Sequence, residues 1–410
     1  MKNYLLILFS QVLPTWFGRQ VRNMTMALNK KAEKPMPFLE GIDHFESPHR
    51  KNKSVLVVMR PSAWLTALAQ YPDIKLYNNS GFIYGLVQAL NANGYVVDLL
   101  AENTPIKLTK EYDLFIGHGG SCKPTIEQLA PGTPIYQYIS GLYWKVFDIE
   151  SDERYNRFFN KYGGRKPQAH RRSITEMIEG LEYLNEKAGV LFSINCPRMV
   201  AAYGSYAEKF YFTGLGAYLD ELFKVNIEDR NYVEGRKNFI YVGGTSGNLQ
   251  KGLDLLIEAF SKTPELNLYI YCKVEEEILQ YCRKELASPN IHYIYHWRYK
   301  PFHKSLKKLL QKTVYSVHAP INIGMGTAFM ATMGVGMIPV GYVDLADPGE
   351  SAVLTDSWQV DALRACIREA SEKSPEWCRE ASRLTVEKYR AHSDPDTVQQ
   401  NFREMFSLVK

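Results

Sequence analysis

Short apolar runs alternate with amphipathic stretches along the chain from residue 54 onward. In the first half, five apolar runs predict β-strands, at residues 54–59, 95–100, 113–117, 134–139 and 189–194. Between the first two runs, Phe82, Leu86 and Leu90 recur at helical spacing and predict a helix that ends at Asn93-Gly94. Strands that alternate with helices indicate a parallel sheet covered by helices on both faces.

The second half repeats this pattern. Five further apolar runs predict strands, at residues 238–242, 268–272, 291–295, 314–317 and 336–340. A lysine-rich helix is expected near 304–312, and the chain from residue 361 onward is predicted to be helical.

A chain of 410 residues is long for one hydrophobic core, so two domains are expected. We predict an α/β protein with an N-terminal helix and linker at 1–53, a first domain at 54–220 and a second at 236–392. Residues 35–53 show no clear periodicity and are interpreted as linker. The last segment, 393–410, is predicted to be a helix that packs back toward the first domain.

Composition and charge exclude few classes of function. The chain is 45% hydrophobic and 23% charged, with a net charge of +5, which is ordinary for a globular protein and does not indicate nucleic-acid binding. Residues 157–172 carry six basic side chains and no acidic one. We interpret them as a solvated basic loop or, alternatively, as a contact for phosphates or a charged acceptor. Six scattered cysteines without a C-x-x-C pair indicate a reduced, cytosolic protein without a structural zinc.

The first 34 residues are apolar and then aromatic and basic. The run at 4–9 is too short to cross a membrane. Trp16 and Phe17 follow it, together with Arg19, Arg22, Lys30 and Lys31. This pattern is typical of a helix at an anionic membrane surface, or of a helix docked on the protein itself. The expected location is the cytoplasm, with peripheral binding to the inner face of the cell membrane as an option.

One stretch carries most of the chemistry. After the strand at 238–242, the glycine-rich loop Gly243-Gly244-Thr245-Ser246 leads to Lys251, and a helix follows in which Leu253, Leu256, Ile257 and Phe260 share a face. Glycines allow close approach of a ligand, and a helix N-terminus offers free N–H groups and a positive dipole end. We predict an anion pocket that fits a diphosphate; the alternative is an ordinary strand-to-helix turn with a surface lysine.

Five segments resemble glycosyltransferase family 4. They are VGG…KGLDLLIEAF, PNIHYIYHW and MGVGMIPV in the second half, and SGFIYGLVQALNANGYVVDLL and YDLFIGHGG in the first. The resemblance covers roughly residues 54 to 400. It implies the GT-B fold, in which two Rossmann-like, doubly wound domains face a cleft. It also implies a nucleotide-sugar donor, a glycan or lipid-linked acceptor, and a role in bacterial surface polysaccharide synthesis.

The resemblance assigns roles to individual residues. Lys251 is expected to contact the donor diphosphate, and His118 is expected to approach the donor sugar, so both are candidate catalytic residues. Arg60 and Gly81 are expected on the acceptor side, because Arg60 ends a strand where such sheets bind ligands. The remaining expected donor-binding residues are Gly243, Gly244, Thr245, Ser246, His296, Trp297, Gly324, Met325, Gly326 and Thr327.

The sequence also departs from the family. Gly244 stands where the family usually has an arginine, and Ile323 and Ala331 replace two glutamates. The expected enzyme is a retaining transferase without a metal or another cofactor, since no D-x-D motif follows a strand. The lost glutamates leave a GT-B protein that binds without catalysing as a second hypothesis. A dinucleotide enzyme, with Gly324-Met325-Gly326 as its phosphate loop and Asp344 about twenty residues on, is a third. Phe329 occupies the position where that motif needs a small residue.

Overall fold

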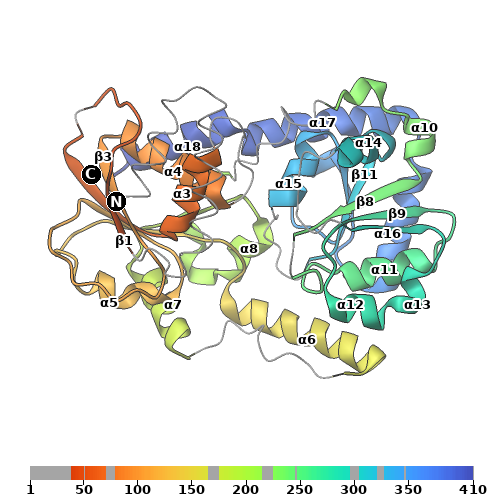
Figure 1. Ribbon diagram of the computed structural model, residues 1–410, viewed down its shortest axis with the longest axis horizontal. Coiled ribbons are helices and arrows are strands. Elements are labelled where there is room, and N and C mark those ends of the chain that lie inside the picture. The colour runs from red at the N-terminus through yellow and green to blue at the C-terminus, as the bar shows by residue number, and fades with distance from the viewer. Residues whose placement is uncertain are drawn as a thin grey trace.

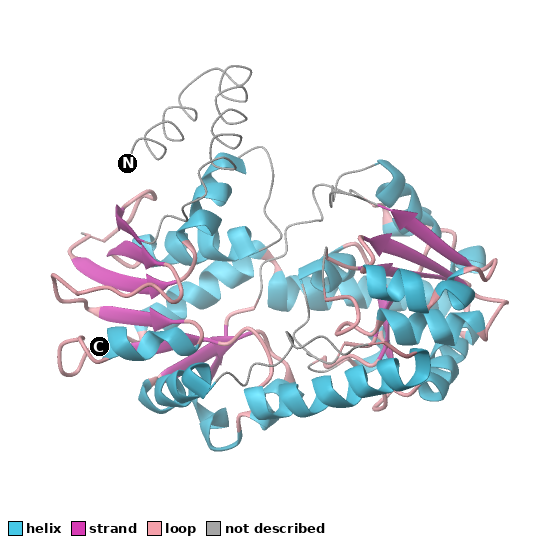
Figure 2. Ribbon diagram, turned by 60° about the horizontal axis from the view of Figure 1, so that its bottom comes forward, coloured by secondary structure: helices cyan, strands magenta, loops and turns pink. Residues whose placement is uncertain are grey.

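The computed structural model contains two sheets, each covered by helices (Figures 1 and 2). It describes residues 38–49, 51–70, 79–164, 175–214, 225–244, 247–295, 304–320, 327–345 and 348–409. Within these ranges, none of the helices combines the length and the apolar character needed to span a bilayer. The N-terminal segment expected at a membrane surface lies outside the described residues.

The first sheet has seven strands in the order β1-β3-β2-β4-β5-β6-β7. All neighbours pair in parallel except β1, which runs antiparallel to β3 at one edge. The strands are β1 (Phe38–Ile42), β2 (Lys53–Val58), β3 (Tyr95–Leu100), β4 (Leu114–Gly117), β5 (Ile135–Tyr138), β6 (Val190–Ser193) and β7 (Phe210–Phe212). The interpretation of residues 35–53 as linker was therefore wrong at β1, whose Gly41 N–H donates to the buried carboxylate of Asp98 at 2.8 Å.

Successive residues of the central strand β2 enter two different cores, as the alternation of side chains along a strand requires. Val55 and Val57 pack with α3 (Pro61–Gln70), α4 (Asn79–Ala92) and α8 (Pro197–Ala202). Leu56 and Val58 pack on the other face with α5 (Lys123–Ile126) and α7 (Thr175–Lys187). Helices thus cover both faces of this sheet, as the sequence predicted.

The second sheet has six parallel strands in the order β10-β9-β8-β11-β12-β13. They are β8 (Asn238–Val242), β9 (Asn267–Cys272), β10 (Ile291–Tyr295), β11 (Tyr315–His318), β12 (Ile338–Gly341) and β13 (Val353–Leu354). One face packs against α11 (Leu253–Ser261), α12 (Glu276–Tyr281) and α16 (Val360–Glu372). The other packs against α14 (Lys304–Lys312), α15 (Thr327–Gly334) and α17 (Pro375–Ser393). The predicted α/β class with two parallel-sheet domains is confirmed.

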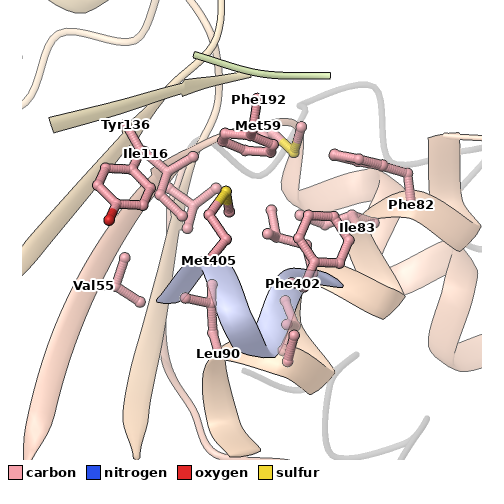
Figure 3. Close-up of a cluster of buried hydrophobic side chains, with 14 of the residues drawn as sticks. Val55, Met59, Phe82, Ile83, Leu90, Ile116, Tyr136, Phe192, Phe402 and Met405 are labelled. Atoms are coloured by element: carbon pink, nitrogen blue, oxygen red, sulfur yellow. The ribbon is translucent and has the colours of Figure 1, made fainter. Parts of the chain in front are cut away.

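The C-terminal helix α18 (Pro395–Ser407) belongs to the core of the first domain. α17 packs on the second sheet through Tyr389, and the chain then crosses back, along the top of Figure 1. Phe402 and Met405 of α18 lie fully buried against Ile83, Leu90 and the first sheet (Figure 3). The end of the chain therefore holds the two domains together.

Helix α6 (Trp144–Tyr162) makes a second connection between the domains. Its Phe147 packs in the core of the first domain, whereas Tyr155, Phe158 and Phe159 are buried in the core of the second. In Figure 1 the helix runs along the bottom of the molecule toward α12 and α13 (Arg283–Leu286).

Ion pairs reinforce this contact. Arg157 Nη2 lies 2.6 Å from Glu258 of α11, and Lys161 Nζ lies 2.7 Å from the same carboxylate. Arg157 also approaches Asp254 at 3.6 Å. These two cations belong to a helix–helix contact, so both interpretations of the basic stretch were wrong for them. Residues 165–172 lie outside the described part of the chain.

The packing of α18 predicts a large stability loss for Phe402→Ala. Truncating a fully buried phenylalanine costs about 3–5 kcal/mol, and Phe402 is completely buried. The matched control is Leu408→Ala, because Leu408 is 59% exposed one residue after the same helix and a surface change stays within about 0.5 kcal/mol. Urea unfolding followed by circular dichroism measures both; equal effects would contradict the packing.

The contact between α6 and α11 predicts a pH-dependent stability. Burial opposes ionisation of Glu258, but hydrogen bonds from Lys161, Lys262 and Arg157 outweigh it and lower its pKa from 4.5 to about 2. Because the folded-state pKa is depressed, the stabilisation is complete above pH 4.5 and disappears as the pH falls through about 2. Glu258→Gln should cost about 2–3 kcal/mol at pH 7, and the difference from wild type should shrink below pH 4.5. A difference that is the same at pH 7 and pH 3 would contradict this.

Candidate functional site

Four polar residues gather at the carboxyl edge of the first sheet. Arg60, Glu102, His118 and Ser140 follow the ends of β2, β3, β4 and β5, which are consecutive in the sheet order β3-β2-β4-β5. Because these strands are parallel, their carboxyl ends lie at one edge, which is where open α/β sheets bind ligands. The sequence predicted Arg60 and His118 for this region; Glu102 and Ser140 were missed.

His118 is held by hydrogen bonds on both ring nitrogens. Its Nδ1 lies 2.9 Å from Glu102 Oε1, and its Nε2 lies 3.0 Å from Ser140 Oγ. The hydrogen bond to His118 lowers the pKa of Glu102, burial opposes this shift, and the charge of Arg60 supports it. An ionised Glu102 accepts a hydrogen bond from Nδ1–H, so in the neutral ring we assign Nε2 as the acceptor, and the Ser140 hydroxyl donates to it. The ring is 25% exposed, so a ligand hydroxyl that displaces Ser140 Oγ can donate to Nε2.

Aromatic rings and glycines fix the position of His118. Its ring lies 5.3 Å from that of Tyr138, which in turn stacks on Phe82 at 4.2 Å. Gly81, the expected acceptor-side residue, is buried in the first turn of α4 beside Phe82. After His118 the chain turns at Gly119, whose φ of 81° favours glycine.

A second group lies at the carboxyl edge of the second sheet. Lys251 is partly buried, and burial lowers its pKa, whereas Cys272 and Glu275 act in the opposite sense. His318 ends β11; burial and the charge of Lys251 lower its pKa to about 3. At neutral pH the imidazole of His318 is therefore uncharged, and its Nε2 lies 2.9 Å from Ser316 Oγ. Lys251, with the uncharged His318 beside it, can therefore bind an anion.

The predicted role of free backbone N–H groups needs correction. Glu275 accepts hydrogen bonds from the N–H groups of Gly247 and Leu249. At the start of α11, the N–H of Leu253 donates to the Asn248 carbonyl, and the Asp254 carboxylate accepts from its own N–H and from Leu255. These N–H groups are used by the protein, so the positive charge of Lys251 becomes the main feature for an anion among the described residues of this turn.

The other predicted donor residues divide into two groups. Gly243 is buried where a Cβ would come within 2.7 Å of Tyr241, so packing requires glycine, and Gly244 is half-buried. Ala331, which replaces a family glutamate, is fully buried in the core formed by α15. The residues outside the described part of the chain are Thr245, Ser246, His296, Trp297, Ile323, Gly324, Met325 and Gly326, together with the side chain of Thr327.

The two carboxyl edges meet at Arg198 of α8. Its backbone N–H donates to Asp344 Oδ2 at 2.8 Å, and its guanidinium donates to Tyr342 and to Glu150 of α6. Tyr342 and Asp344 directly follow β12. Asp344 thus takes part in the contact between the domains. This role argues against the hypothesis that Asp344 binds the ribose of a dinucleotide.

Metal-binding clusters are missing from the described ranges, where no group of three or more His, Cys, Asp or Glu side chains is arranged to hold an ion. All six cysteines are buried, and none of them forms a disulfide.

Comparisons with known proteins give a likeness of fold. No protein-family model matches the chain, and no curated protein matches it by sequence. Sucrose-phosphate synthase from Thermosynechococcus elongatus has a TM-score of 0.60 at 14% identity, over 87% of this chain and 99% of that one. HepE of Anabaena, solved with UDP and glucose, has a TM-score of 0.54 at 15% identity, over 88% and 100%. The UDP-forming α,α-trehalose-phosphate synthase of Burkholderia xenovorans has a TM-score of 0.50 at 13% identity, over 86% and 82%.

These similarities establish the fold of the chain and do not establish its reaction. The chain has the GT-B architecture shared by these glycosyltransferases, so this part of the sequence-based resemblance is confirmed.

The turn that carries His118 predicts an unusual effect of Gly180→Ala. Alanine normally stabilises a helix interior by about 0.5–1 kcal/mol relative to glycine. At Gly180 of α7, however, a Cβ would lie 1.6 Å from the Gly120 carbonyl oxygen, two residues after His118. Overpacking of this kind costs about 1–3 kcal/mol, so we expect a net loss in thermal or urea unfolding. Gly189→Ala is the control, since its Cβ would meet only the Ile135 carbonyl at 4.0 Å. A more stable Gly180→Ala variant would contradict the packing.

Proposed function

We propose that the chain is a glycosyltransferase that moves a sugar from a nucleotide-sugar donor to a glycan or lipid-linked acceptor. The carrying observation is the pairing of two polar groups at two sheet edges: His118 with Glu102 on the first sheet, and Lys251 with neutral His318 on the second. One of the structures that this chain resembles holds UDP and glucose. Transfer with retention and without a metal follows the resemblance to family 4.

Each group has a chemical task in this proposal. Lys251 stabilises the diphosphate as negative charge develops on the leaving group, which is when a preorganised cation contributes most. His118 accepts a hydrogen bond at Nε2 from a sugar hydroxyl that takes the place of Ser140 Oγ, and Glu102 fixes the ring and its tautomer. Arg60, whose side chain is 75% exposed, supplies charge on the acceptor side.

A second candidate function is a GT-B subunit that binds a nucleotide sugar without turning it over. Its support is Ala331, the expected counterpart of a family glutamate, which is fully buried and carries no carboxylate. An N-terminal segment at an anionic membrane surface, in a bacterium that builds surface polysaccharide, fits either function. Both require donor binding, and only the first requires turnover.

Thermal shift against UDP, GDP, CMP and NAD tests the shared requirement. We expect stabilisation by one nucleoside diphosphate and none by NAD, since binding to the folded state raises the midpoint by mass action. Stabilisation by NAD alone would overturn the proposal. Turnover of the corresponding nucleotide sugar then separates the transferase from the binding subunit.

Lys251→Ala should reduce turnover by about 10²–10³-fold, the effect typical of removing one preorganised charge-stabilising group, and should also weaken donor binding. Lys284→Ala is the control, because Lys284 is an exposed lysine on α13 of the same domain. Single-turnover kinetics with the donor found above measure both variants. Wild-type turnover in Lys251→Ala would remove the basis of the donor-site assignment.

A further inference from the structure

Arg154 of α6 lies between Ala319, which follows β11, and Gly252, which immediately precedes α11. Its Nη2 donates to the carbonyl oxygen of Ala319, the residue after His318. The same nitrogen would lie 2.6 Å from a Cβ on Gly252, the residue after Lys251. The guanidinium thus packs directly behind the backbone that carries Lys251 and His318.

The guanidinium of Arg154 makes one hydrogen bond among the described residues and lies 5.0 Å from the ring centroid of Trp358. The Arg154 side chain is buried, and its Nε and Nη1 have no hydrogen-bond partner among the residues that the structure describes. Ser151 Oγ, one turn earlier on α6, is also buried without a hydrogen-bond partner among the described residues. Burial lowers the pKa of Arg154 to about 10, while Asp254 opposes this shift and Arg157 adds to it. Arg154 therefore remains protonated at neutral pH.

A second buried arginine shows how a purely structural guanidinium is satisfied in this protein. Arg230 is as buried as Arg154, and burial likewise lowers its pKa to about 10. Its Nη1 and Nη2 each donate to a backbone carbonyl at 2.7 Å, those of Gly336 and Val335, and among the described residues its Nε alone lacks a partner. Arg154 has one such bond. Buried N–H groups of a cation that lack hydrogen-bond partners reduce the stability of the folded state. A function of Arg154 would explain why the protein keeps it at this position.

The loop in front of Arg154 is short of positive charge. Gly244 occupies the position at which the resemblance expects an arginine, and the carboxylate of Glu275 is bound to the backbone of the same loop. Lys251 is the only cationic residue in the sequence from 243 to 252. A protonated guanidinium immediately behind Gly252 raises the positive potential there, and burial keeps it poorly screened by solvent.

We propose that Arg154 is a positioning residue of the diphosphate site, which rests on the proposed function. It supplies a second positive charge to this site from a helix of the first half of the chain, and it fixes Gly252 and Ala319 relative to each other. Gly252 is glycine both because its φ is 75° and because any side chain would displace the guanidinium. Donor recognition in this protein thus depends on the docking of α6.

The test compares UDP and uridine binding to full-length variants by calorimetry, with GDP and guanosine instead if GDP stabilises the wild type. Arg154→Gln keeps a donor for Ala319 but loses the charge; Arg154→Lys keeps the charge. We expect Arg154→Gln to weaken diphosphate binding by about 10–100-fold, one to two factors of ten at 1.4 kcal/mol each, with nucleoside binding unchanged. Arg154→Lys should recover most of the loss.

Arg157→Gln is the matched control, because Arg157 lies one turn later on α6 and pairs with Glu258. It should lower stability and leave the ratio of diphosphate to nucleoside affinity unchanged. The inference is overturned if Arg154→Gln leaves UDP affinity unchanged, or if it weakens UDP and uridine equally. If Arg154→Gln does not fold, Arg154→Lys decides: an affinity near that of wild type supports the role of charge, and a loss as large for uridine as for UDP overturns it. A wild type that binds no nucleoside diphosphate overturns the proposed function itself.

Discussion

The parallel arrangement of strands is the constraint on which the rest of this structure depends. It brings the carboxyl ends of β2, β3, β4 and β5 to one edge, and with them Arg60, Glu102, His118 and Ser140. The same rule collects the loops after β8, β11 and β12 at the edge of the second sheet. Polar residues that are 16 or 42 positions apart in sequence, such as Glu102 and His118 or Arg60 and Glu102, become neighbours in space, while the strands themselves remain apolar and buried.

The buried charged side chains differ in the partners that stabilise them. Glu258 is surrounded by Arg157, Lys161 and Lys262, and its low pKa reflects this compensation. Arg230 is satisfied by carbonyl oxygens. At the second sheet edge, by contrast, Lys251 and Arg154 are cations whose pKa values burial lowers, and His318 is kept neutral. Two cations at this edge fit the negative charge of a diphosphate.

The sequence revealed the apolar strands well and the polar contacts poorly. Ten strands were visible as apolar runs, but β1 was missed because Gly41 and exposed Glu40 interrupt its five residues. β7 and β13 were also missed, because they are only three and two residues long. The basic residues of α6 were misinterpreted because their acidic partners lie about 100 positions away on α11. Glu102 was missed because nothing local distinguishes a glutamate that orients a histidine 16 positions later. The loop N–H groups were overvalued because Glu275, which occupies two of them, follows the next strand.

A crystal structure of the protein with UDP tests the central claim most directly. The account predicts the diphosphate at the carboxyl edge of the second sheet, with a phosphate oxygen within about 3 Å of Lys251 Nζ, as in a charge-assisted hydrogen bond. It also predicts the uncharged His318 near the same group and the guanidinium of Arg154 behind Gly252. A diphosphate bound elsewhere, with Lys251 still engaged only by the protein, would contradict the account.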